Sequence, residues 1–72
     1  MRLFVGKNCI PCKQLKAWLA ANSIEIEQIV AEDNMEIATE AGVKSLPTLQ
    51  LDDNSLIKGG EEIMEYFSED DE

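Results

Sequence analysis

Two cysteines separated by two residues, Cys9 and Cys12, are the side chains of this chain best suited to covalent chemistry. If a helix begins at the first of them, both sulfurs face the same side of its first turn and can close a disulfide with little rearrangement. The N-terminus of a helix stabilises a thiolate on Cys9, whereas Cys12, one turn further in, is expected to be buried and protonated. The spacing therefore predicts thiol–disulfide exchange, with Cys9 as the nucleophile and Cys12 as the resolving thiol.

The Cys-x-x-Cys spacing also fits half of a zinc site or two unrelated core thiols. A four-ligand zinc site needs two more cysteines or histidines, and the 72 residues contain no histidine and no other cysteine. Only assembly across a dimer could complete such a site, so no metal is expected. The pair follows a short apolar strand and a break at Gly6 and stands at the start of a helix, and this position favours the redox interpretation.

Length and composition indicate one globular domain. Seventy-two residues, 44% of them apolar, with a mean hydropathy of −0.21, fit a single folded core. No apolar run approaches the roughly 20 residues of a membrane-spanning helix, and the first residues lack the apolar stretch of a signal peptide. We therefore expect a cytoplasmic protein, and in a reducing compartment a close cysteine pair is more often chemical than structural.

The charges of the chain are unevenly distributed. The net charge of −9 argues against nucleic acid or a membrane as partner. Residues 1–23 hold four bases and no acid, whereas residues 24–72 hold two bases and all fifteen acids. Chance and solubility could produce this asymmetry. The alternative is that an electropositive segment, containing Arg2, Lys7, Lys13 and Lys16, surrounds the cysteines and favours thiolate over thiol.

Apolar periodicity and turn residues predict seven elements in the order β-α-β-α-β-β-α. The expected strands cover residues 2–5, 24–30, 46–51 and 55–58. The expected helices cover residues 9–21 and 35–41, with a last helix that opens at Gly59-Gly60 and carries Ile63, Met64 and Phe67. A parallel pair of strands joined by the first helix, followed by an antiparallel hairpin, gives an α/β fold with a four-stranded mixed sheet and helices on both faces.

Residues 1–67 are expected to form the domain, and residues 68–72 an acidic tail. The tail places four acids after the C-terminal end of the last helix, where the helix dipole disfavours negative charge. We expect it to be frayed and solvated.

The succession of strand, Cys-x-x-Cys and helix, followed by Ser45-Leu46-Pro47-Thr48 and then by Gly59-Gly60, resembles the glutaredoxin branch of the thioredoxin superfamily. The resemblance covers residues 1–67 and implies a minimal thioredoxin fold. It also implies a monomeric dithiol–disulfide oxidoreductase that reduces disulfides of proteins or small molecules, with glutathione as a co-substrate. The resemblance implies that ribonucleotide reductase could receive electrons from this chain.

The resemblance assigns a docking edge to Ser45, Leu46 and Pro47. In that family the proline at the position of Pro47 is cis and lies against the dithiol. A cis bond would turn the backbone of Leu46 outward, leaving its N–H and C=O free to pair with an extended substrate. An edge-strand or turn proline in trans is the alternative.

The resemblance also assigns residues to glutathione. The family's double glycine precedes a helix whose first amides hold the γ-glutamyl carboxylate, which places Gly60, Glu61 and Glu62 at those positions. The alternative is that the glycines make a turn and the glutamates suit a first helical turn. The family's lysine for the glycine carboxylate of glutathione is carried over to Lys7.

The active-site turn Ile10-Pro11 has its proline before the second cysteine, as in thioredoxins, rather than after the first, as is usual in glutaredoxins. This departure leaves glutathione and thioredoxin reductase as alternative electron donors. Two other classes stay open: a dimer that binds an iron–sulfur cluster through Cys9 and glutathione, and a non-catalytic interaction domain. The last predicts a thiol pKa near the unperturbed value of about 8.5.

Overall fold

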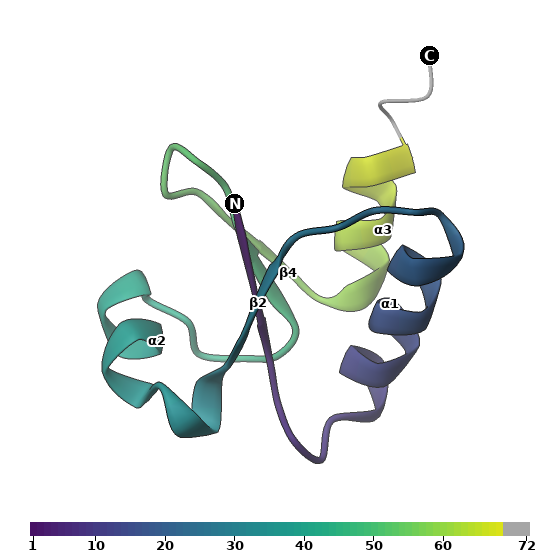
Figure 1. Ribbon diagram of the computed structural model, residues 1–72. Helices are drawn as coiled ribbons and strands as arrows, with labels where there is room; N and C mark the ends of the chain where they lie inside the picture. The colour runs from purple at the N-terminus through teal and green to yellow at the C-terminus, as the bar shows by residue number, and fades with distance from the viewer. Residues whose placement is uncertain (69–72) are drawn as a thin grey trace.

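The computed structural model describes residues 1–68, which form an α/β fold on one four-stranded mixed sheet (Figure 1). The strands are β1 (Arg2–Val5), β2 (Glu27–Val30), β3 (Thr48–Gln50) and β4 (Leu56–Lys58). Within these residues there are three α-helices, α1 (Ile10–Ala21), α2 (Met35–Ala41) and α3 (Gly60–Ser68), and a 3₁₀ helix, η1 (Ala31–Asp33). The predicted order of strands and α-helices is confirmed, and η1 is an addition to it.

β1 is the central strand of the sheet. It pairs in parallel with β2 and antiparallel with β3, and β3 pairs antiparallel with β4, giving the order β2-β1-β3-β4. Leu3, Phe4 and Val5 are fully buried, as expected for a strand covered on both faces. Because the parallel pair ends in register at Val5 and Val30, the segments that follow β1 and β2 leave the sheet at the same edge.

Helices cover both faces of the sheet, as predicted. Figure 1 shows α1 and α3 on one side and α2 on the other. On the first side, Leu3 and Val5 of β1 pack in a core with side chains of both helices and of β3, and on the second side Phe4 packs with Ile29 and Ala38. The alternation along β1 therefore divides its side chains between two apolar clusters.

α1 forms the connection between the parallel strands and confirms its predicted stripe. Cys12, Leu15 and Leu19 are buried at i, i+3 and i+7. The helix ends at Asn22, whose side-chain Nδ2 donates to the Trp18 carbonyl at 2.8 Å. Among residues 1–68 no helix is long and apolar enough to cross a membrane.

α2 has the predicted bounds, but its start differs in detail. Asn34 stands at the N-cap position without a capping hydrogen bond from its side chain, because its Nδ2 donates instead to the Val30 carbonyl at 3.0 Å. Gly42 ends the helix with a left-handed backbone (φ 84°), a conformation that costs glycine little.

Three predicted strands are longer than the observed ones, and the last of them, expected over 55–58, begins at Leu56. The strand expected over 24–30 begins at Glu27, because Glu27 pairs with Arg2, the first residue of β1. Ile24 and Ile26 still pack against the core. The alternation therefore predicted correctly that these side chains point inward, but not that the segment lies outside the strand. The strand expected over 46–51 is limited to Thr48–Gln50.

The C-terminal boundary also differs. Ser68 was assigned to the tail and is the last residue of α3. The remainder of the predicted tail, residues 69–72, lies outside the described residues.

Leu49 is fully buried at the centre of the sheet, so its substitution tests the packing of the core. We expect Leu49→Ala to lower the free energy of unfolding by about 3 kcal/mol, since apolar burial is lost and a cavity is left behind. The control is Ile10→Ala at a side chain that is 69% exposed, where we expect a change below about 0.5 kcal/mol. Urea denaturation measures both, and equal losses would contradict this core.

Candidate functional site

The sulfur of Cys9 caps the N-terminus of α1. Cys9 has an extended backbone (φ −110°, ψ 106°), and its Sγ accepts a hydrogen bond from the Cys12 N–H at 3.2 Å. The Cys9 carbonyl accepts the next bond from the Lys13 N–H at 3.1 Å. Pro11 lies in the first turn, where a missing N–H leaves no partner unsatisfied. The predicted position of the pair at a helix start is confirmed.

The two cysteines are joined by a disulfide, and their Cα atoms are 5.2 Å apart. Cys12 is fully buried, whereas Cys9 is partly exposed. Ile10 and Pro11 between them are exposed. The predicted difference in burial is confirmed, so Cys9 is the residue of the pair that keeps contact with solvent.

Three segments converge on Gly6, in the loop between β1 and α1. A Cβ atom at this position would lie 3.0 Å from Leu46 Cδ1 and 3.3 Å from both Cys9 Cβ and Glu32 Oε1. The three atoms border the position that a side chain at residue 6 would occupy. Glycine has no Cβ atom, so the three segments can approach one another there. The geometry brings Leu46 beside Cys9, and it adds the Glu32 carboxylate, which the sequence analysis did not select.

The Leu46–Pro47 peptide bond is cis, as the family resemblance implied. The Pro47 side chain is buried, and its carbonyl accepts a hydrogen bond from the Gly59 N–H at 3.0 Å. The Ser45 carbonyl accepts from Thr48 Oγ1 at 2.6 Å. Within residues 1–68, no backbone hydrogen bond engages the N–H or C=O of Leu46. An extended ligand could therefore pair with this residue.

The N-terminus of α3 lies beside the turn that carries the cysteines. A Cβ atom at Gly60 would stand 3.9 Å from the Pro11 carbonyl oxygen. Glu61 and Glu62 follow in the first turn of the helix and are exposed. The fold thus brings Gly60 next to the cysteine turn, and the contact of these residues with glutathione stays a prediction.

Lys7 is engaged within the chain. Its Nζ lies 2.9 Å from Asp33 Oδ1, and its backbone N–H donates to Glu32 Oε1 at 2.5 Å. The hydrogen bond to Asp33, followed by the electrostatic attraction of the same carboxylate, raises the pKa of Lys7 above its ordinary value. Both side chains are more than half exposed, so salt screens the pair. Lys7 connects the cysteine loop to η1, and its contact with glutathione stays a prediction.

The bases near the cysteines in the sequence are joined by acids in the folded chain. Arg2 lies at the far end of β1, where its Nε donates to Gln50 Oε1 at 2.9 Å. Glu32 and Asp33 of η1 lie against the cysteine loop, and Gly60, at the start of the acidic first turn of α3, lies near the Pro11 carbonyl. The fold therefore brings to the dithiol acids that are distant from it in the sequence.

Glu32 could have been found from the predicted topology. Val5 and Val30 are register partners at the ends of the parallel strands. Lys7 and Glu32 each follow these partners by two residues, so their two loops are neighbours. The sequence analysis named the parallel pair but did not compare the residues that follow its two strands.

Within residues 1–68, no cluster of three or more histidine, cysteine, aspartate or glutamate side chains could hold a metal ion.

Comparison of the chain with models of protein families, with curated proteins and with solved structures finds no match. The function of the site is therefore inferred from its own geometry.

The capping role of Cys9 can be measured apart from the disulfide. In a Cys12→Ser background, Cys9→Ser keeps an oxygen that accepts the capping hydrogen bond, whereas Cys9→Ala removes the acceptor. We expect the alanine variant to be less stable than the serine variant by about 1 kcal/mol. Urea denaturation under matched conditions provides the comparison, and equal stabilities would show that this side chain does not cap α1.

The close approach at Gly6 gives a second prediction. Gly6→Ala requires Leu46 and Glu32 to shift by a few tenths of an ångström, and we expect a loss of about 1 kcal/mol in the free energy of unfolding. Gly60→Ala is the matched control, because the nearest atom to its Cβ position is 3.9 Å away. Thermal unfolding of both variants provides the measurement, and a larger loss at Gly60 would contradict the packing described at Gly6.

Proposed function

We propose that this chain is a dithiol–disulfide oxidoreductase, a glutaredoxin-like member of the thioredoxin superfamily. The observation that carries the proposal is the placement of Cys9. Its sulfur caps a helix, the residue is partly exposed, and the buried Cys12 is bonded to it. The Leu46 side chain, next to the cis Leu46–Pro47 bond, borders the same space at Gly6 as the Cys9 Cβ atom.

The arrangement of the sheet supports a minimal thioredoxin fold. The order β2-β1-β3-β4, with only β1 and β2 parallel, is the arrangement that this fold requires. The cysteine pair follows the central strand, and the proline edge precedes the next strand in the sheet. Both therefore lie at one edge of the sheet, as a docking edge opposite a dithiol must.

The proposed reaction transfers two electrons to a substrate disulfide. The Cys9 thiolate attacks one substrate sulfur, which breaks the substrate S–S bond, forms a mixed disulfide and releases the other substrate sulfur as a thiolate. The Cys12 thiolate then attacks Cys9 Sγ, which releases the second substrate thiolate and forms the Cys9–Cys12 disulfide. The two protons lost by the cysteines balance those taken up by the substrate thiolates.

The helix start supports the first step. The Cys12 N–H that hydrogen-bonds to Cys9 Sγ also stabilises negative charge on that sulfur, and the N-terminal end of the α1 dipole acts in the same direction. Regeneration of the dithiol requires two electrons from an external thiol, either two glutathione molecules or the dithiol of a reductase.

The assigned roles can be separated by replacing each cysteine. We expect Cys9→Ser to lower the rate of disulfide reduction by at least about 100-fold, because the attacking thiolate is lost. We expect Cys12→Ser to make the first attack and then to accumulate a mixed disulfide. Stopped-flow assays with pre-reduced protein, followed by intact mass spectrometry, measure both results.

The two variants serve as controls for each other, because each removes the internal disulfide and retains the size of the side chain. A Cys9→Ser variant that keeps full turnover while Cys12→Ser loses it would reverse the assignment. Absence of disulfide reduction by the unmodified chain, with glutathione or with thioredoxin reductase as donor, would contradict the proposed function.

A further inference from the structure

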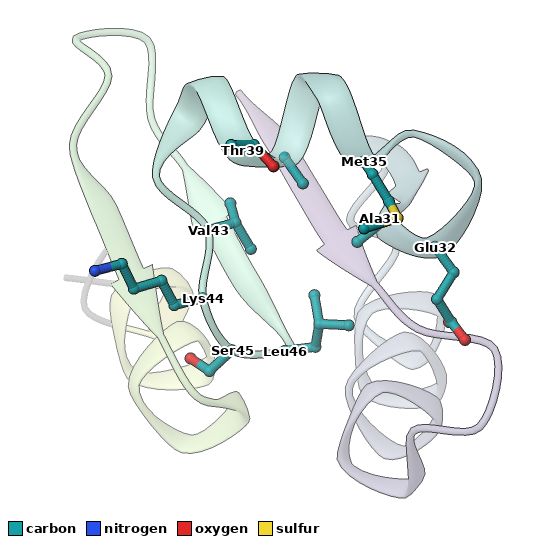
Figure 2. Close-up of a pocket in the computed structure, with 9 residues that line it drawn as sticks. Ala31, Glu32, Met35, Thr39, Val43, Lys44, Ser45 and Leu46 are labelled. Atoms are coloured by element: carbon teal, nitrogen blue, oxygen red, sulfur yellow. The ribbon is translucent and has the colours of Figure 1, made fainter.

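A hollow of about 240 Å³ lies between α2 and the segment that leads to Pro47 (Figure 2). We call it the α2 hollow, and its lining includes Met35, Ala38 and Val43. In Figure 2 Met35 extends down from α2, and Leu46 extends from below toward the same helix. The lining is mostly apolar. Sites for small molecules typically have volumes of about 300–1,000 Å³, and the α2 hollow is smaller than that. A hollow of this size suits a single apolar side chain.

The α2 hollow shares two of its lining residues with the surroundings of Cys9. Leu46 and Glu32 both line the hollow, and atoms of both also stand beside Cys9 around the Gly6 position. The backbone N–H and C=O of Leu46, which lines the hollow, have no backbone partner within residues 1–68. A substrate chain that hydrogen-bonds to the Leu46 backbone while its cysteine reacts with Cys9 would therefore place a neighbouring side chain at the hollow.

The surroundings of the dithiol combine exposed apolar groups with negative charge. Ile10, between the cysteines, and Met35, at the hollow, are each 69% exposed, and exposed apolar groups around a site favour contact with a protein. The Glu32 carboxylate lies at the end of the hollow nearest to Cys9, and Figure 2 shows Lys44 at the opposite end. Near Cys9, the Glu32 carboxylate therefore offers a negative charge to a substrate.

We infer that the substrate is a polypeptide disulfide, with a large apolar side chain that enters the α2 hollow and a basic residue next to the reacting cysteine whose positive charge Glu32 attracts. The inference rests on the proposed function and names its substrate class. In an extended chain, residues two apart face the same side, about 6.6 Å from one another. The apolar residue is therefore placed two positions from the cysteine.

Glutathione fits these features poorly. Each glutathione unit carries two carboxylates and one ammonium, so that its net charge opposes the carboxylates of η1 and of the first turn of α3. It also has no large apolar side chain for the hollow. A polypeptide with a lysine or arginine beside its cysteine is attracted by the same carboxylates that repel glutathione. Its apolar side chain is also buried in the α2 hollow.

The test uses a disulfide-linked dimer of the synthetic peptide acetyl-Leu-Lys-Cys-Lys-Leu-amide, whose symmetry makes the direction of binding immaterial. One comparison probe has alanine in place of leucine, and another has glutamate in place of lysine. Pre-reduced protein is mixed with each probe, and second-order rate constants are compared. We expect the leucine probe to react about tenfold faster than the alanine probe, and the lysine probe about threefold or more faster than the glutamate probe.

Two variants connect these preferences to the structure. Thr39→Phe places a ring at an exposed position of α2 that lines the hollow, and we expect it to remove the preference for leucine. Its control, Glu36→Phe, adds the same ring on α2 outside this lining. Glu32→Gln keeps an oxygen acceptor for the Lys7 N–H and is expected to remove the preference for lysine, whereas Glu36→Gln is expected to retain it.

Equal rates with the leucine and alanine probes, or preferences that survive Thr39→Phe and Glu32→Gln, would overturn the inference. A probe with serine in place of cysteine cannot react and separates docking from chemistry. We expect it to shift the amide NMR signals of Thr39 and Val43, and the absence of such shifts would also overturn the inference. Shifts without reduction of any probe would support docking at the hollow and contradict the proposed function instead.

Discussion

The hydrogen bond from the Cys12 N–H to the Cys9 sulfur joins the stability of α1 to the chemistry of the site. A helix start needs acceptors for its first N–H groups, and serine, threonine or aspartate usually provides one. Here the Cys9 sulfur provides it, so the atom that caps the helix is also the atom that forms the disulfide. Any change that moves the start of α1 therefore also moves the reactive sulfur.

The surroundings of that sulfur depend on the ends of three strands. β1 and β2 end in register, which places the Gly6–Cys9 loop beside η1, and β3 begins directly after the buried Pro47. The Gly59 N–H bonds to the Pro47 carbonyl and so connects this edge to the start of α3. Short loops from a small sheet are thereby held together, and Cys9 and Leu46 of these loops pack against the core. Glycine at position 6 is part of this arrangement, because a side chain there would contact three of the converging segments.

The features that could be predicted from the sequence are those with local signals. Pro11 beside the cysteines, Gly42 after a short apolar segment and the Gly59-Gly60 pair fix helix ends, because each acts through its own backbone preferences. The start of β2 could not be predicted from the alternation of Ile24 and Ile26, because pairing depends on where the neighbouring strand begins. The prediction of the charge around the dithiol was incomplete for a similar reason. Basic residues next to Cys9 in the chain were counted, whereas Glu32 reaches it only through the register of β1 and β2.

The complete burial of Cys12 has a consequence for oxidative damage. In the reduced chain, a peroxide molecule would reach the partly exposed sulfur of Cys9 and not that of Cys12. The sulfenic acid formed there would have a thiol one helical turn away, with the Cα atoms at disulfide distance, and condensation of the two releases water and gives the internal disulfide. That product can be reduced again, whereas further oxidation to sulfinic or sulfonic acid could not be reversed by thiols. Shielding one sulfur therefore keeps a repair partner intact beside the sulfur that is at risk.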